Sequence, residues 1–264
     1  MTKAIVIIPT YKERENIQSI IEAVFSLPVN FHVLIVDDSS PDGTAEIVED
    51  LQTVCNADVW KLHLIKRPGK QGLGTAYITG FHYAIQKKYD FILEMDADFS
   101  HDPKDLVRLY NTCHKDGADL SIGSRYATGV NVVNWPIGRV LISYFASSYV
   151  RTITSMPIKD TTAGFVCYRR KVLETIPLEK VKFIGYAFQI EMKFLTWKYG
   201  FKLQEVPIIF TDRTRGESKM SAGIFKEAFF GVLNMTVNSW FKKYIPTTGY
   251  KESPNFTEAV QQRF

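Results

Sequence analysis

The chain has 264 residues, of which 45% are hydrophobic and 23% charged, values typical of a globular protein with a sizeable core. Its 32 basic and 28 acidic side chains leave a net charge of +4. This excess suits a phosphate-bearing substrate or an anionic membrane surface, but without a clustered basic patch it gives no indication of nucleic-acid binding. Three widely spaced cysteines exclude a disulfide framework and a Cys-x-x-Cys metal site, and they indicate a reducing compartment.

The first half of the chain alternates apolar, β-branched segments with segments of helical periodicity. In chain order we expect a strand at 4–9, a helix at 14–26, a strand at 33–37, a helix at 44–54, a strand at 59–65, a helix at 74–87, a strand at 91–95, a helix at 103–115 and a strand at 119–123. Apolar strands separated by amphipathic helices predict a parallel sheet covered on both faces. Ligands bind such sheets at the carboxyl ends of the strands, which directs attention to residues 10–13, 37–42 and 96–101.

The second half is less regular. There we expect a helix at 138–154, a strand at 164–169, a helix at 186–198, a strand at 205–210 and a last helix at 222–244. The pattern predicts a catalytic domain over 1–220, an amphipathic C-terminal helix over 221–245 and a flexible tail over 246–264. The first nine residues lack the features of a secretion signal, and the apolar stretch 228–241 is too short for a membrane span of roughly 20 residues.

Two acids, Asp96 and Asp98, directly follow the expected strand 91–95. Such a pair is common in loops and can be no more than an acidic turn. At the end of a buried strand, however, two adjacent carboxylates favour a cation between them. Mg²⁺ and Mn²⁺ prefer carboxylates together with substrate phosphates. The pair therefore predicts a divalent ion that stabilises a departing nucleoside diphosphate.

Two further acidic segments lie at expected strand ends. Asp38 either begins the Ser-Ser-Pro-Asp-Gly turn and caps the next helix, or accepts hydrogen bonds from a nucleotide base or ribose. Residues 9–16 form a helix start whose acids suit the positive end of the helix dipole. In that segment Tyr11 can also stack on a base and Glu13 can accept a hydrogen bond from it. Both interpretations stay open at this point.

Basic residues come later in the chain. Arg125 follows the expected strand 119–123, which brings its guanidinium near the same edge of the sheet. Residues 213–219 carry three cations and a glycine. They form either a solvated surface or a mobile loop that closes over phosphates. The segment 69–74 is rich in glycine but lacks the Gly-Lys-Ser/Thr ending of a P-loop, so we interpret it as the start of a helix near the nucleotide.

Together these segments resemble family 2 glycosyltransferases with the GT-A fold, and more narrowly the dolichyl-phosphate and polyprenyl-phosphate mannose synthases. The resemblance covers roughly residues 3 to 235. It is carried by IPTYKEREN at 8–16, VDDSSPDGT at 36–44, GLGTAY at 72–77, MDADFSH at 95–101, GSRY at 123–126, TAGF at 162–165, GYAFQIEM at 185–192 and RTRGESK at 213–219. The first of these motifs and Asp-x-Asp are common in the family, whereas the last two are more specific.

The resemblance implies a Rossmann-like, mostly parallel sheet flanked by helices, and it assigns roles to individual residues. Asp96 and Asp98 would hold Mg²⁺ or Mn²⁺ and, with Arg125 and Arg139, form the catalytic set, the two arginines meeting the acceptor phosphate. The nucleotide-sugar site would comprise Pro9, Tyr11, Glu13, Val36, Asp38, Asp96, Ala97, Asp98, Ser100, Arg213 and Lys219. Gln189 and Glu191 would lie near the donor sugar or the acceptor entrance. Some relatives carry Gln in place of Ser100 and a basic residue in place of Ala187.

The implied reaction moves mannose from GDP-mannose to dolichyl or polyprenyl phosphate with inversion. The acceptor phosphate is already ionised, so it needs orientation and charge screening more than a general base. We expect a cytoplasmic protein that is peripheral on the inner face of the membrane, with segments 140–150 and 222–244 at the bilayer or packed on the sheet. Alternatives are sugar transfer from a UDP donor, nucleotidyl transfer, and a catalytically silent binding module.

Overall fold

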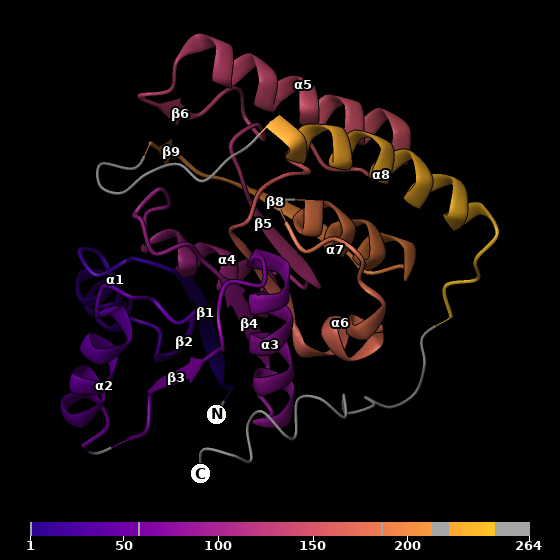
Figure 1. Ribbon diagram of the computed structural model, residues 1–264. Coiled ribbons are helices and arrows are strands. Elements are labelled where there is room, and N and C mark those ends of the chain that lie inside the picture. The colour runs from indigo at the N-terminus through magenta and orange to yellow at the C-terminus, as the bar shows by residue number, and fades with distance from the viewer. Residues whose placement is uncertain (1, 58, 186, 213–221, 246–264) are drawn as a thin grey trace.

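The computed structural model describes residues 2–57, 59–185, 187–212 and 222–245, and for 222–228 it describes the backbone only (Figure 1). Within these residues the central sheet has seven strands. Their order across the sheet is β3 (Leu62–Lys66), β2 (Phe31–Asp37), β1 (Ala4–Thr10), β4 (Phe91–Glu94), β7 (Val166–Arg169), β5 (Leu120–Ser124) and β8 (Leu203–Pro207). Neighbouring strands are parallel except around β7, which runs antiparallel to both β4 and β5.

Helices cover both faces of this sheet. One face packs against α1 (Ile17–Phe25), α2 (Thr44–Cys55) and α4 (Asp105–His114); the other packs against α3 (Leu73–Gln86), α6 (Arg170–Thr175) and α7 (Ala187–Lys198). Along β1, Ile5 and Ile7 belong to the second of these cores, whereas Val6 and Ile8 belong to the first. Because both faces are buried, the strand is apolar from Ala4 to Pro9, as the sequence pattern predicts.

Two longer helices lie beyond the carboxyl edge of the sheet. They are α5 (Ile137–Thr154) and α8 (Ala222–Trp240), and they run beside each other at the periphery of the molecule (Figure 1). The Tyr149 ring of α5 stacks on Phe229 of α8 with centroids 4.5 Å apart, and its hydroxyl donates to the Phe229 carbonyl. A short parallel pair, β6 (Val132–Val133) and β9 (Phe210–Thr211), lies near the start of α5. In the part of the chain described here, no helix combines the length and the apolar character that crossing a bilayer requires.

The predicted elements are present, with three differences. The first helix begins at Ile17 and not at residue 14, because 11–16 form a loop in which Lys12 has φ of 58°. The predicted strand 205–210 is two strands, β8 and β9, which belong to different sheets. The predicted strand 164–169 is β7, which begins only at Val166; its antiparallel direction had not been predicted either way. The predicted domain boundary after residue 220 and the tail 246–264 lie outside the described residues.

Candidate active site

The carboxyl ends of β1, β2 and β4 meet at one edge of the sheet. Pro9 lies level with Val36, and Thr10 with Asp37, in the parallel register of β1 and β2. On the other side of β1, the Met95 N–H donates to the Ile7 carbonyl at 3.1 Å, so the chain that carries Asp96 leaves the sheet beside Pro9. The register thus brings three sequence-predicted segments together.

A cavity of about 960 Å³ extends from this edge to α5 and α8. Its polar lining includes Tyr77, Asp96, Asp98, Ser100, His101, Arg125, Trp135, Arg139, Thr162 and Gln189. Its apolar lining includes Leu73, Leu141, Ile142, Phe145, Tyr149, Val150, Ile190, Phe210 and Phe229. The two predicted carboxylates and the two predicted acceptor arginines therefore share one cavity. Helices α5 and α8 contribute part of its apolar wall.

A tight turn orients the second acid of the Asp-x-Asp motif. Phe99 has φ of 58°, a left-handed conformation that non-glycine residues seldom adopt. The turn allows one Asp98 oxygen to accept from the Ser100 N–H at 3.0 Å and from the Ser100 hydroxyl at 2.6 Å. Asp98 is buried and Asp96 half-buried. Such local strain at a cavity is typical of functional turns.

The acidic pair at the end of β2 divides into two roles. Asp37 is fully buried and accepts from the Thr10 hydroxyl at 2.8 Å and from the Ser40 N–H and hydroxyl, so it fixes the turn. Asp38 forms an ion pair with Arg67, whose Nε lies 2.6 Å from its carboxylate. Burial raises the pKa of Asp38, although the charge of Arg67 opposes the shift. Arg67, which the sequence did not single out, thus sets the position of the predicted nucleotide-binding acid.

The loop after β1 presents Tyr11 to solvent-accessible space between two lysines. The Lys70 ammonium lies 5.2 Å from the centre of the Tyr11 ring, and that of Lys12 lies 5.7 Å from it. Glu13 accepts from the Asn16 amide at 3.0 Å, and its backbone N–H donates to Thr44. An aromatic ring flanked by cations suits a base carrying a phosphate chain.

Arg125 is held by the Asp160 carboxylate, a pairing that was not predicted from the sequence. Its Nε and Nη2 donate to the two oxygens of Asp160 at 2.7 and 2.6 Å, and Nη2 also donates to Thr162. Burial alone would raise the pKa of Asp160, but the charge and hydrogen bonds of Arg125 outweigh burial and hold it below its ordinary value. The guanidinium is therefore fixed in place on the cavity wall.

Arg139, in the first turn of α5, lines the same cavity. Its Nη1 donates to both carboxylate oxygens of Asp212 at 2.9 Å. The guanidinium also lies 4.2 Å from the centre of the Trp135 ring, a close cation–π contact. Both contacts hold the side chain toward the cavity.

Beneath the Asp-x-Asp turn lies a buried polar cluster that joins the predicted Gln189 to two residues that were not predicted, Glu94 and Lys193. The Gln189 amide donates to Glu94, the last residue of β4, and Lys193 donates to the Ala163 carbonyl and to the Gln189 carbonyl. Burial raises the pKa of Glu94 to about 8 and lowers that of Lys193 to about 8. An acid at the end of an otherwise apolar strand, Phe91-Ile92-Leu93-Glu94, is the signal that could have found it.

Glu191, two residues after Gln189, holds the backbone of the segment that precedes α7. Its carboxylate accepts from the backbone N–H groups of Lys182 and Phe183 at 2.8 and 2.9 Å. It therefore fixes the segment before α7, and Gln189 alone of the two contributes to the cavity lining. The predicted Arg213 and Lys219 lie outside the described residues.

Several buried polar atoms of the cavity wall have no hydrogen-bond partner among the described residues. They are the Tyr77 hydroxyl, the indole Nε1 of Trp135 and Nδ1 of His101. Burial lowers the pKa of His101 to about 4, so its ring is neutral near pH 7 and Nδ1 is one of two distinct ring nitrogens. Buried polar atoms are normally satisfied, so these three are available to hydrogen-bond with a polar ligand in the cavity.

The donor set also fits a divalent ion. Within the described residues, no three or more His, Cys, Asp and Glu side chains form a ready-made metal cluster. Asp96 and Asp98 are two carboxylates on one cavity wall. Mg²⁺ is typically held by one or two carboxylates with water and substrate phosphates completing its shell, and this pair is of that kind.

Comparison with known proteins agrees with this geometry. Residues 5–177 match the family model described as glycosyl transferase family 2. The chain is 45% identical over 230 residues to a polyprenol monophosphomannose synthase of Mycolicibacterium smegmatis, covering 87% of this chain and 85% of that protein. It is 41% identical over 234 residues to an undecaprenyl-phosphate mannosyltransferase of Micrococcus luteus, covering 89% and 93%.

Solved structures with the same fold are more distant in sequence. Glucosyl-3-phosphoglycerate synthase from Mycobacterium tuberculosis, solved with Mn²⁺, UDP and glucosyl-3-phosphoglycerate, superposes with a TM-score of 0.62 at 15% identity, covering 94% of this chain and 82% of that one. S. aureus TarS in complex with UDP-GlcNAc gives a TM-score of 0.60 at 17% identity, covering 99% and 71%. At these identities the likeness shows the GT-A fold alone.

Proposed function

Because this chain belongs to glycosyl transferase family 2, we propose that it transfers mannose from GDP-mannose to a polyprenyl phosphate. The names of its relatives support the mannosyl group and the polyprenyl acceptor. The observation that carries the proposal is the shared cavity. Asp96 and Asp98 line it together with Arg125 and Arg139, and α5 and α8 contribute an apolar wall. A diphosphate, an acceptor phosphate and a hydrocarbon chain each find matching chemistry there.

The donor would bind across the carboxyl edge of β1, β2 and β4. Tyr11 offers a ring for the base, and Asp38, positioned by Arg67, offers a carboxylate to the ribose or the base. Asp96 and Asp98 would hold Mg²⁺ or Mn²⁺ against the diphosphate. The ion supplies charge stabilisation as the nucleoside diphosphate leaves. We assign Pro9, Val36, Ala97 and Ser100 to the walls of this donor site, with Glu13 behind Tyr11.

The acceptor phosphate would lie between the two arginines. Asp160 and Thr162 use Nε and Nη2 of Arg125, which leaves Nη1 without a hydrogen bond among the described residues. Asp212 accepts from Nη1 of Arg139, so Nε and Nη2 of that side chain also have no hydrogen bond among the described residues. Each guanidinium is thus fixed by one carboxylate and offers its remaining donors to an anion. Such fixed donors orient an ionised phosphate oxygen for attack on the sugar carbon and lower the repulsion between the two phosphate groups.

The hydrocarbon chain of the acceptor would leave along α5 and α8. Leu141, Ile142 and Phe145 line the cavity and are each 48% or more exposed. An apolar wall that continues onto an exposed apolar helix face suits a lipid that stays in a bilayer while its phosphate reaches the enzyme. We therefore propose peripheral binding to the inner face of the membrane, with 1–220 as catalytic domain and 221–245 as interfacial helix.

A transfer assay tests this proposal. The purified chain is incubated with undecaprenyl phosphate in vesicles, with Mn²⁺ or EDTA, and with GDP-mannose, UDP-glucose or UDP-GlcNAc as donor. We expect mannosyl lipid from GDP-mannose and Mn²⁺ only. Asp98→Asn should lower the rate by about 100-fold or more, because it removes a carboxylate that would hold the ion against the diphosphate. Asp102→Asn, an exposed acid four residues further on, is the matched control. Transfer from a uridine donor alone would overturn the donor assignment. An Asp98→Asn variant as active as the wild type would overturn the metal assignment.

A further inference from the structure

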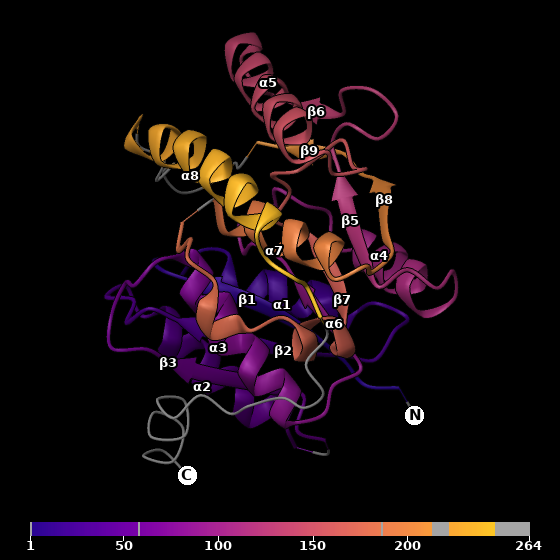
Figure 2. The same cartoon turned by 90° about the vertical axis from the view of Figure 1, so that its right-hand side faces the viewer.

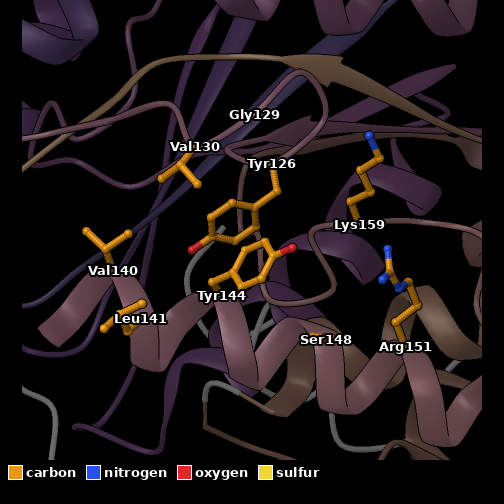
Figure 3. A pocket seen from close by; sticks show the side chains of 9 residues that line it. All are labelled: Tyr126, Gly129, Val130, Val140, Leu141, Tyr144, Ser148, Arg151 and Lys159. Atoms are coloured by element: carbon orange, nitrogen blue, oxygen red, sulfur yellow. The ribbon is translucent and has the colours of Figure 1, made fainter. Parts of the chain in front are cut away.

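A second cavity, of about 480 Å³, lies on the other side of α5 (Figure 3). It is formed by α5, by the segment that follows β5 and by Lys159. Its lining residues are Tyr126, Gly129, Val130, Val140, Leu141, Tyr144, Ser148, Arg151 and Lys159. In Figure 2, α8 and the segment after β5 lie on opposite sides of α5. Leu141 contributes to both cavities, but none of the proposed catalytic residues contributes to this one.

The two ends of this cavity differ in character. Val130, Val140 and Leu141 make one end apolar, whereas Arg151 and Lys159 make the other cationic, and the two groups lie well apart along α5 in Figure 3. At a rise of about 1.5 Å per residue, Val140 and Arg151 are about 16 Å apart along the helix axis. The site therefore suits an elongated occupant with a charged end and a hydrocarbon end.

Two tyrosines build the middle of the cavity. Their rings meet edge to face with centroids 5.5 Å apart, and the Tyr126 hydroxyl donates to Ser143 at 2.8 Å. Tyr126 is 3% exposed and Tyr144 is 44% exposed. Figure 3 shows the Tyr144 hydroxyl directed toward the cationic end. A buried, hydrogen-bonded ring thus supports a more exposed one, and the latter brings a hydroxyl into reach of a polar headgroup.

The cationic end has no anion of its own among the described residues. Neither Arg151 nor Lys159 takes part in an ion pair there. Lys159 donates one ammonium hydrogen to the Ala127 carbonyl at 2.8 Å, which holds the side chain in place and leaves two more donors. The nearby Glu205 carboxylate accepts from the backbone N–H groups of Lys159 and Asp160. Two cations without an acidic partner are complementary to a phosphate.

We propose that this cavity binds an anionic membrane phospholipid, which is not a substrate. Its phosphodiester lies between Arg151 and Lys159, its glycerol region lies against Tyr144 and Ser148, and its hydrocarbon runs along Val130, Val140 and Leu141. The exposed Leu141 joins this end to the apolar face of α5, so the lipid's chain continues into the bilayer. Free phosphate would occupy the cationic end only. The bound lipid fixes the side of α5 that faces the membrane, and it contacts Tyr126, the residue after Arg125.

Vesicle binding tests the site without donor or acceptor. The chain is titrated with phosphatidylcholine vesicles that contain no or about one third phosphatidylglycerol, and bound protein is measured by sedimentation. We expect the anionic lipid to increase binding. The double variant Arg151→Gln, Lys159→Gln should lower binding to the anionic vesicles by about 20-fold, because each basic residue at an anionic surface contributes a few-fold to about tenfold. Lys104→Gln, Lys115→Gln serves as the matched control, because it removes two exposed cations, one at each end of α4.

A second variant separates a bound lipid from diffuse surface charge. Ser148→Phe fills the cavity without changing its charge, and we expect it to lose the preference for anionic lipid as the double variant does. Wild-type preference in Ser148→Phe would overturn the proposal and assign the effect to surface charge. If inorganic phosphate at millimolar concentration abolished the preference for anionic lipid, the proposal would be overturned, and the site would be assigned to a free anion. Thermal unfolding confirms that each variant is folded, and mannosyl transfer in detergent is measured separately, so failure of the proposed function leaves this result interpretable.

Discussion

Asp160 and Arg125 form a buried ion pair, which fixes the guanidinium at the proposed acceptor end of the cavity. Asp160 is 0% exposed, and its carboxylate accepts from the Arg125 N–H, Nε and Nη2. Such a pair contributes little net stability when complete, but loss of one partner leaves an uncompensated buried charge. The stability and the position of the Arg125 side chain therefore depend on the Asp160 carboxylate.

Asp160→Asn should lower the free energy of unfolding by about 3 kcal/mol or more, because Arg125 would stay buried without an anion. Urea denaturation measures it. Asp119→Asn is the control and should cost at most about 1 kcal/mol, because it weakens ion pairs with the partly exposed Lys171 and Arg169 while an amide oxygen can still accept from the Lys202 N–H. Equal losses in the two variants would show that Arg125 finds other compensation and that the pair does not position it.

His63 makes the stability depend on pH at a place far from the cavity. Burial, with the charges of His32 and Lys87, lowers the pKa of His63 from 6.5 to about 4. The unfolded chain therefore binds a proton between pH 6.5 and 4 that the folded chain does not. Stability is fully present above pH 6.5 and falls, by at most about 1.4 kcal/mol per pH unit, as the pH drops through this window.

His63→Gln should flatten this part of the stability curve, which urea denaturation at pH 4 to 7 measures. The same substitution at His114, which is exposed at the end of α4, is the matched control for loss of an imidazole. An unchanged slope in His63→Gln would assign the acid sensitivity to other groups.

Residue types predicted the carboxylate and arginine positions, but not their partners. Asp96, Asp98 and Arg125 could be picked out because they follow apolar strands, a local pattern. Asp160 lies 35 positions after Arg125, and Arg67 lies 29 after Asp38, so each pairing depends on the path of the chain through space. No spacing rule links such residues, which is why both ion pairs became visible only in the folded molecule.

Among the elements, α3 packs against the sheet through a glycine. A Cβ on Gly80 would lie 2.7 Å from Cγ2 and 2.9 Å from Cδ1 of Ile7 in β1. Gly80→Ala should therefore destabilise the fold by about 1 to 3 kcal/mol, because the overpacking exceeds the gain in helix propensity. Thermal or urea unfolding measures the difference.

Gly138→Ala in α5 is the matched control for that substitution. A Cβ there would meet no heavy atom within 4 Å, so the variant should be neutral or more stable by up to about 1 kcal/mol. If Gly80→Ala were as stable as Gly138→Ala, α3 would be able to move off β1 at no cost, contrary to the close packing described here.

Strand direction was the main feature of the elements that the sequence left open. Val166-Cys167-Tyr168 is apolar, which predicts a buried strand but contains no information about its direction. Likewise, the sequence pattern predicts one strand at 205–210, although the register with β5 ends at Pro207 and Phe210 already pairs with β6. The direction and the pairing of a strand depend on which strands lie beside it in the fold, and the local hydrophobic pattern contains no information about them.

At the scale of the molecule, exposed apolar side chains gather on the two peripheral helices. Ile137, Ile142 and Phe145 of α5 are more than half exposed, as are Trp240 and Phe241 at the end of α8. Both helices lie at the same side of the molecule, beyond the carboxyl edge of the sheet (Figure 1). An exposed apolar patch of this kind marks a contact surface, here the proposed membrane face.

Trp240→Ser, Phe241→Ser should lower partitioning onto phosphatidylcholine vesicles by about tenfold, because roughly 1.5 kcal/mol or more of apolar burial is lost. Val59→Ser, Trp60→Ser is the matched control, since these side chains are also more than half exposed but directly precede β3, away from α5 and α8. Equal partitioning of all three proteins would place the membrane contact elsewhere.

The antiparallel strand β7 also determines the order in which the molecule can be completed during synthesis. Residues 4–94 contain β1 to β4 in mutual register, but β4 keeps an unpaired edge until residues 166–169 have been made. β5 is synthesised earlier, yet both of its neighbours, β7 and β8, follow it in the chain. The growing polypeptide therefore exposes an aggregation-prone strand edge over some 70 residues of translation. The half that carries the carboxylates can form first, and the half that carries Arg125 joins it only when β7 arrives.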